Sequence, residues 1–113
     1  MVQDEVLDHM YAARRDLTRL IVDLAPEGDE QREQLEALVA RRDQLSAAIR
    51  AVIDAEFRAA QRPEMLDAVN LLKAETKSLN GLAKTLENVT KAVDITGKVI
   101  DLAVKVIAFA AGA

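Results

Sequence analysis

Between Glu75 and Phe109 the pattern of apolar and polar residues repeats every seven positions. Written in units of seven, this stretch reads ETKSLNG, LAKTLEN, VTKAVDI, TGKVIDL and AVKVIAF. The third place of every unit is lysine, and the fifth place is always a large aliphatic residue. Seven residues make nearly two turns of an α-helix, so each place forms a stripe along one side of that helix. The pattern therefore predicts a helix with a continuous apolar stripe and a continuous lysine stripe.

In heptad notation the large aliphatic column is position d, and it extends back to Met65. Position a carries mostly small residues, of which Gly97 is the smallest. A small a column favours close approach of a neighbouring helix, and we expect the closest point at Gly97. Position g is also mostly apolar, and three apolar columns in seven are typical of a globular helical bundle rather than a two-stranded coiled coil.

The same register passes through Asn80 and Gly81, a dipeptide common in turns, without a slip. A turn has no reason to preserve the phase of the repeat. We therefore expect one continuous helix over about residues 64–111, roughly 70 Å long at 1.5 Å per residue.

Two shorter helices are predicted before this repeat, over about residues 3–25 and 29–62, because apolar residues recur there at spacings of three and four. The turn sequence Ala25-Pro26-Glu27-Gly28 separates them, and so short a loop predicts an antiparallel hairpin. Pro63 favours a corner before the last helix, and the alternative is a kink within a longer helix. The fold class is thus all-α: a helical hairpin plus a long heptad-repeat helix, forming an oligomeric bundle with a single domain over residues 1–113.

From about Ala92 onward the last helix is apolar around most of its circumference, apart from a narrow strip of acids and lysines. A helix of this kind is buried on several sides or lies in lipid. The first interpretation predicts a non-enzymatic interaction protein that forms a homo-oligomer or binds a helical partner. The alternative is a membrane-active protein that inserts residues 92–113. The expected interface residues are Leu79, Leu86, Val93, Gly97, Ile100, Leu102, Val104, Val106, Ile107 and Phe109.

Composition and charge narrow the remaining possibilities. A formal net charge of −4 disfavours nucleic acid as a partner, since neutralising phosphates requires a basic face, and the absence of cysteine removes disulfide and thiolate chemistry. The chain starts with acidic residues rather than a signal peptide, which predicts a cytoplasmic protein, and no uncharged apolar run reaches eighteen residues. Glu5 and His9 are one turn apart, but two ligands do not make a metal site. We therefore expect no catalytic, cofactor-binding or metal-binding residues.

Overall fold

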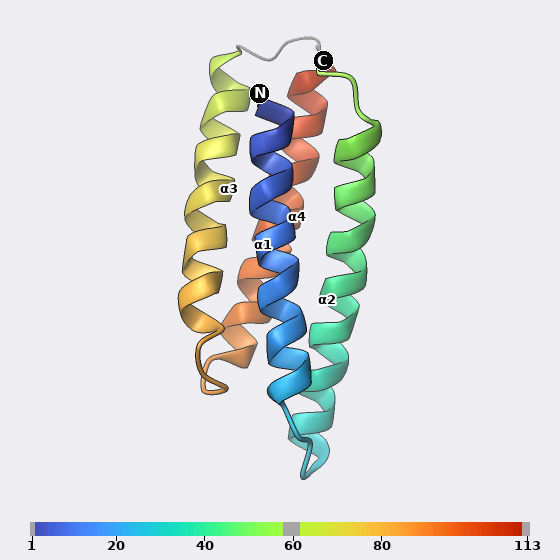
Figure 1. Cartoon of the computed structure of the whole chain (residues 1–113), viewed down its shortest axis with the longest axis vertical. Helices are drawn as coiled ribbons and strands as arrows, with labels where there is room; N and C mark the ends of the chain where they lie inside the picture. The colour runs from blue at the N-terminus through green and yellow to red at the C-terminus, as the bar shows by residue number, and fades with distance from the viewer. Residues whose placement is uncertain (1, 58–61, 112–113) are drawn as a thin grey trace.

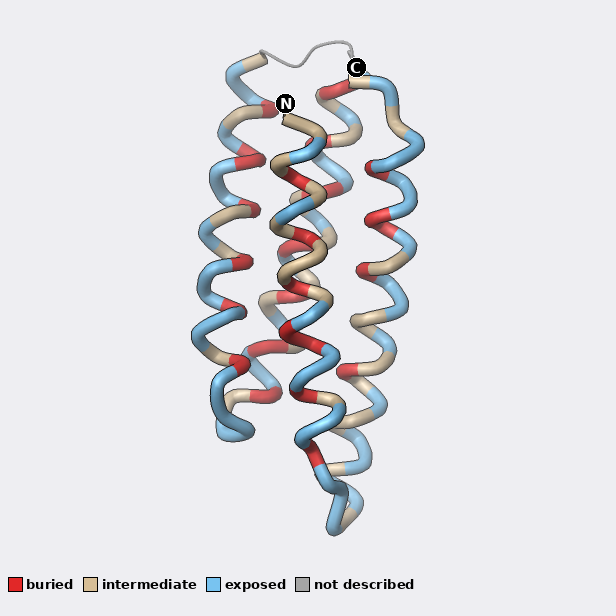
Figure 2. The backbone as a smooth tube through the Cα atoms, viewed as in Figure 1, coloured by how far each residue is buried: buried red, intermediate tan, exposed pale blue. Residues whose placement is uncertain are grey.

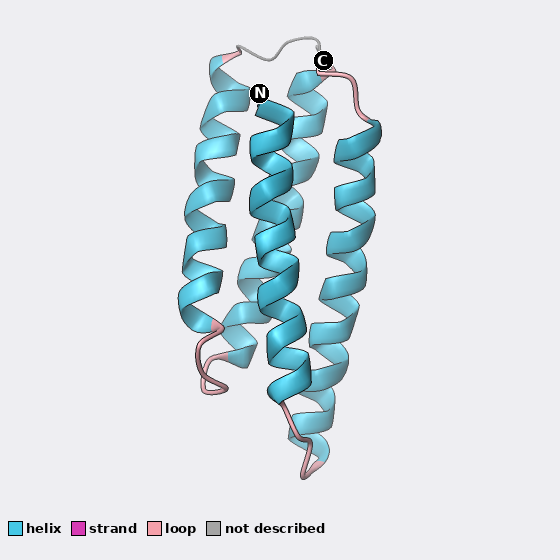
Figure 3. Cartoon of the chain, viewed as in Figure 1, coloured by secondary structure: helices cyan, strands magenta, loops and turns pink. Residues whose placement is uncertain are grey.

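The computed structural model describes residues 2–57 and 62–111 of the chain. Within these residues the protein is all-helical, without a strand (Figure 3). The four helices lie side by side and form a molecule of 48 × 22 × 17 Å (Figure 1). Their bounds are α1 (Val2–Asp23), α2 (Asp29–Asp54), α3 (Pro63–Leu82) and α4 (Val89–Ala110).

Each helix has two close neighbours in this bundle. Helix α1 packs against α2 and α3, and helix α4 packs against the same two helices from the opposite side. Helices α2 and α3 occupy opposite corners and do not touch each other within the described residues. Because successive helices alternate in direction, α1/α3 and α2/α4 are parallel pairs, whereas α1/α2 and α3/α4 are antiparallel (Figure 1).

The turn between α1 and α2 lies where the sequence predicted it, but α2 ends earlier than predicted. Helix α1 ends at Asp23, before the turn that contains Pro26, and α2 begins at Asp29. Helix α2 was expected to reach about Arg62, but it ends at Asp54, and residues 58–61 lie outside the described residues. The early end coincides with hydrogen bonds from the side chain of Gln3. Its amide nitrogen donates to the carbonyl oxygens of Val52 at 2.7 Å and Ala55 at 3.1 Å, which satisfies groups that a helix end leaves unpaired.

Pro63 forms a corner rather than a kink. It is the first residue of α3, and Arg62 before it has an extended backbone with φ of −65° and ψ of 132°. Proline suits the first turn of a helix because it has no amide hydrogen to leave unpaired, and it pushes the preceding residue out of the helical region.

The prediction of one continuous helix over residues 64–111 is wrong. The chain leaves the helix after Leu82, turns through residues 83–88 and returns as α4. The turn contains Thr85 and Asn88, which have low helix propensity, but no proline and no glycine. The physical reason for the break lies in packing. A helix of roughly 70 Å would leave the apolar residues beyond Ala92 without a neighbour, whereas folding back packs α4 along both α2 and α3.

The buried stripe also changes register across this turn. In α3 all of the buried residues except Ala68 lie at positions a and d, but in α4 each buried position lies one residue earlier in the repeat. One residue corresponds to a rotation of about 100° around the helix axis. The buried residues of α3 are Met65, Ala68, Val69, Leu72, Thr76 and Leu79, and those of α4 are Val89, Ala92, Thr96, Val99, Ala103, Val106 and Ala110.

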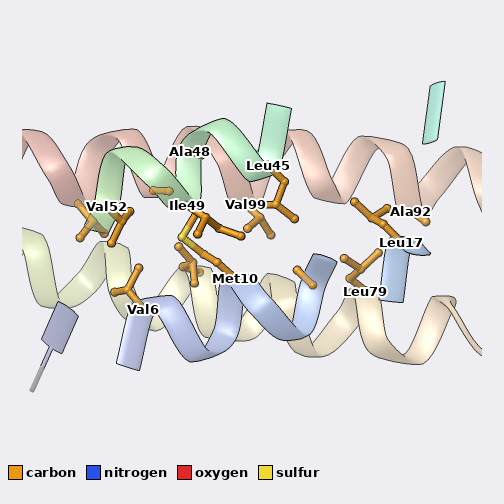
Figure 4. Packing of buried hydrophobic residues seen from close by; sticks show 14 of the residues in the cluster. Val6, Met10, Leu17, Leu45, Ala48, Ile49, Val52, Leu79, Ala92 and Val99 are labelled. Carbon is orange, nitrogen blue, oxygen red and sulfur yellow. The ribbon is translucent and has the colours of Figure 1, made fainter. Parts of the chain in front are cut away.

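All four helices contribute buried side chains to one core along the bundle axis (Figures 2 and 4). Its largest fully buried side chains include Met10, Leu17 and Leu72. The stripe of α4 alternates valine with alanine or threonine, and such small residues allow the neighbouring helices to approach. The buried hydroxyls of Thr76 and Thr96 donate to the carbonyl oxygens four residues earlier, both at 2.8 Å.

Candidate functional site

The residues predicted to form an interface separate into several groups in the structure. Two of them, Leu79 and Val106, are fully buried inside the bundle of one chain. Leu86 lies in the turn between α3 and α4 and is 42% exposed, and Val104 on α4 is 58% exposed. The other six are partly buried: Val93, Gly97, Ile100, Leu102, Ile107 and Phe109.

Most of the apolar circumference of α4 is covered by the other helices of the same chain. Helix α3 covers one side, α2 covers the other, and α1 adds contacts across the centre. Partly buried residues such as Ile95 and Ile100 pack against the core from the two sides of α4. Of the large apolar residues of α4, only Val104 is strongly exposed. The surface available to a partner is therefore smaller than the sequence of α4 suggests.

Gly97 lies beneath an arginine of α2. A Cβ atom at this position would approach the guanidinium of Arg41, with Nη2 at 2.9 Å and Cζ at 3.1 Å. The guanidinium also donates from Nη1 to Oε1 of Gln44 at 2.8 Å. Gly97 was expected at the tightest point of a small-residue column. Instead, its nearest neighbours are the far end of a flexible side chain.

This location makes alanine acceptable at Gly97. Gly97→Ala gains helix propensity of up to about 1 kcal/mol, and the guanidinium of Arg41 can move by the small distance required. We expect the free energy of unfolding to rise by a few tenths to about 1 kcal/mol, measured by urea denaturation. Gly81→Ala is the control, because a Cβ there meets nothing within 4 Å and no side chain has to move to admit it. Destabilisation at Gly97 alone would mean that Arg41 cannot move.

An apolar groove runs between α3 and α4 on the outside of the bundle. It consists of two adjoining hollows of about 290 and 320 Å³, which share Leu71, Leu102 and Lys105. Leu71 is 56% exposed, although it is a large apolar side chain at the junction of the two hollows. We call this feature the α3/α4 groove. It is lined by Glu64, Asp67, Ala68, Leu71 and Glu75 of α3 and by Lys98, Asp101, Leu102, Lys105 and Phe109 of α4.

The two walls of the α3/α4 groove differ in charge. The α3 wall carries three acids, which we call the acidic rim: Glu64, Asp67 and Glu75. The α4 wall carries Lys98 and Lys105, which we call the lysine rim, and Asp101 lies between them. Glu64 forms an ion pair with Arg62 at 3.9 Å. Within residues 2–57 and 62–111, the other charged groups of the two rims form no ion pair within 4 Å.

One end of the groove is shaped by an arginine. The guanidinium of Arg62 lies over the ring of Phe109, 5.5 Å from its centroid. A cation in this position is attracted by the electrons of the ring face. The contact connects the start of α3 to the end of α4 at this end of the groove.

The heptad repeat did not identify Leu71 as an interface residue, because this leucine lies outside the a and d columns. A signal was nevertheless present in the sequence. Leu71 and Leu72 are adjacent, and adjacent residues on a helix point in directions about 100° apart. When Leu72 occupies the buried stripe, Leu71 must lie at its edge. Leu72 is fully buried and Leu71 is 56% exposed, as this geometry requires.

A second groove, of about 520 Å³, runs between the parallel helices α1 and α3. Near one end, Glu5 forms an ion pair with Lys73. Farther along, both carboxylate oxygens of Asp16 accept hydrogen bonds from the amide of Asn80, at 3.2 and 3.3 Å. Asp16 is only 3% exposed, which is unusual for a charged residue. These polar contacts link α1 to α3 and fix the position of one helix along the other.

The ion pair at this groove lowers the pKa of Glu5. The hydrogen bond from Lys73 is the largest cause, followed by the attraction of its positive charge. Because the folded pKa lies below the ordinary value, the pair contributes to stability at neutral pH, and this contribution is lost as the pH falls through the lowered pKa. The carboxylate is exposed, so water screens the pair and its contribution is small.

Neither groove brings together the ligands of a metal ion. In the part of the chain that the structure describes, no three histidine, cysteine, aspartate or glutamate residues cluster closely enough to hold one. His9, which sequence analysis paired with Glu5, lines the α1/α3 groove together with Lys73. Among the helices of residues 2–57 and 62–111, none combines the length and apolar character needed to cross a bilayer.

Comparison with known proteins gave no match to a protein-family model, to a curated protein or to a solved structure. The functional inference therefore rests on the surfaces of the molecule.

Proposed function

We propose that the protein is a non-enzymatic interaction module and that the α3/α4 groove is its binding surface for an apolar helical surface of another protein chain. The observation that carries this proposal is the exposure of Leu71. This leucine is 56% exposed at the junction of two hollows, beside the apolar side chain of Leu102. Covering a large apolar side chain removes it from water, a favourable contribution of about 25 cal/mol per Å² of apolar surface before the costs of association are subtracted.

The charges around the groove support the same proposal. Protein interfaces combine an apolar centre with a polar periphery, and the α3/α4 groove has this arrangement. Asp67 and Lys105, on opposite walls, form no ion pair with any of the described residues. They are thus available to pair with charges on a partner. The exposed Val104 lines neither hollow, so it is not part of the proposed surface.

Site-specific crosslinking tests this function and captures a partner of any identity. Leu71 is replaced by the photoreactive residue p-benzoylphenylalanine, in purified protein and in the native cells. Val22 on α1 is the matched control position, because it is apolar, 76% exposed and outside the groove. We expect a covalent adduct to a protein chain from position 71 and none from position 22.

Two measurements decide the outcome. The adduct should disappear when Lys98 and Lys105 are both replaced by glutamate, since those changes alter one wall of the groove. Circular dichroism should show the same helix content in all variants, which excludes unfolding as the cause. The absence of any adduct from position 71, in purified protein and in cells alike, would overturn the proposed function.

A further inference from the structure

We infer that the partner in the α3/α4 groove is a second copy of this chain, related to the first by a two-fold axis parallel to the helices. This inference rests on the proposed function, because it names the occupant of the same groove. Its basis is that the groove is complementary in charge to itself. A two-fold dimer uses the same surface on both copies, so any complementarity must already be present within one surface.

The order of the charged residues along the groove is the first step. Helices α3 and α4 are antiparallel, so residue numbers increase in opposite directions along the acidic rim and the lysine rim. At one end Asp67 shares a hollow with Lys105 on the opposite wall, and at the other end Glu75 shares a hollow with Lys98. Each of these two acids therefore lies at about the height of a lysine on the opposite wall.

Symmetry then selects one arrangement. Two copies can face each other through this groove by rotation about an axis along the groove or about an axis across it. Rotation about the axis across the groove places α3 over α3 and α4 over α4, so that like charges meet. Rotation about the axis along the groove keeps every residue at its height and places α3 of one copy over α4 of the other. Only this second arrangement brings opposite charges together.

The resulting contacts involve the charged side chains of the groove that form no ion pair within the described residues of one copy, and the exposed Leu71. Asp67 of one copy then lies over Lys105 of the other, and Glu75 lies over Lys98. Leu71, at the centre, lies over the second copy's Leu102. Every contact occurs twice, because the axis exchanges the two copies. Asp101 lies on the α4 wall between the two lysines of the lysine rim, and its negative charge offsets part of the attraction.

A charge-exchange experiment tests this arrangement. The first variant carries Asp67→Lys and Glu75→Lys, which makes both walls basic. The second carries Lys98→Glu and Lys105→Glu, which makes both walls acidic. Glu64 is left unchanged because it pairs with Arg62. Association is measured by sedimentation equilibrium, with the 12.4 kDa mass of one chain as the reference.

We expect the wild-type protein to sediment with twice the mass of one chain at micromolar concentration. Each variant alone should self-associate at least about tenfold more weakly, since attraction across the groove becomes repulsion. An equimolar mixture of the two variants should recover a dimer. A third variant with all four changes should also recover it, because exchanging both rims restores complementarity. Recovery in the mixture and in the third variant also shows that the altered chains still fold.

The possible failures have different meanings. A monomeric wild-type protein whose position 71 crosslinks to a different protein would overturn this inference and leave the proposed function standing. A dimer that both charge variants retain would overturn the two-fold arrangement, because the rims would then lie outside the interface. A monomeric wild-type protein without any adduct from position 71 would overturn both.

Discussion

Leu72→Ala is expected to lower the free energy of unfolding by about 2–5 kcal/mol, the range for deletion of a fully buried leucine side chain. Leu72 has no exposed surface, and it lies in the stripe that α3 presents to the core. The substitution removes buried methyl groups and leaves a cavity that the surrounding helices fill only in part. For a chain of this length, each kcal/mol corresponds to a change of about 4 °C in melting temperature. Thermal unfolding followed by circular dichroism therefore measures the effect directly.

The neighbouring residue provides the control. Leu71→Ala removes the same atoms from the same helix one position earlier, but Leu71 is 56% exposed. We expect its effect on the unfolding of the monomer to stay below about 1 kcal/mol, since surface substitutions rarely exceed that value. The same variant should weaken association through the α3/α4 groove. Equal destabilisation by the two substitutions would mean that Leu71 is buried in the core to the same extent as Leu72, which contradicts its place in the groove.

Asn80→Leu is expected to cost about 1–3 kcal/mol of unfolding free energy, because it leaves the buried carboxylate of Asp16 without its hydrogen bonds. Asp16 is 3% exposed, and within the described residues the amide of Asn80 is the group that donates to it. A buried charge without a partner loses the solvation that it has in the unfolded chain. Urea denaturation of the single variant measures this cost.

A double-mutant cycle isolates the interaction between the two side chains. Asp16→Leu removes the buried charge and leaves the amide of Asn80, which is exposed and can bind water instead. The variant with both leucines should therefore recover most of the stability that Asn80→Leu loses, since replacing both partners by apolar groups is often neutral. If Asn80→Leu alone is neutral, water in the α1/α3 groove hydrates the carboxylate and the amide is dispensable.

Both ends of α1 and the starts of α2 and α3 could be predicted to within two residues, because they depend on local chemistry. Pro26 and Gly28 mark the first turn, and Pro63 marks the corner before α3, since proline restricts its own backbone and that of the residue before it. The early end of α2 could not be predicted in the same way. It coincides with hydrogen bonds from Gln3, which lies 49 residues away from Val52 in the sequence.

The break between α3 and α4 could not be predicted for a different reason. A continuous repeat does not require a continuous helix, because a repeat records only which faces are apolar. Beyond Ala92 nearly every face is apolar, so a rotation of the buried stripe by one residue leaves the pattern intact. The same ambiguity affected Gly97, which lies in a small-residue column of the repeat but beneath the side chain of Arg41 in the structure.

The candidate interface illustrates the limit of the pattern most clearly. Leu102 and Phe109 were among the predicted residues, and they line the α3/α4 groove. Leu71 and the acidic rim come from α3, and they belong to the same groove only because the chain turns back after Leu82. A site built from two helices cannot be recognised before their pairing is known.

The sequence by itself determined that the chain is helical and that it is interrupted at the turn of Pro26 and Gly28 and at Pro63, because these properties depend on near neighbours along the chain. Only the tertiary structure decided which apolar faces became core and which remained on the surface. Apolar residues in excess of one stripe can be buried in more than one way, and the choice depends on which helices become neighbours. By turning back at residues 83–88, the chain covered most of α4 with its own helices and left Leu71 exposed in a groove between two oppositely charged walls.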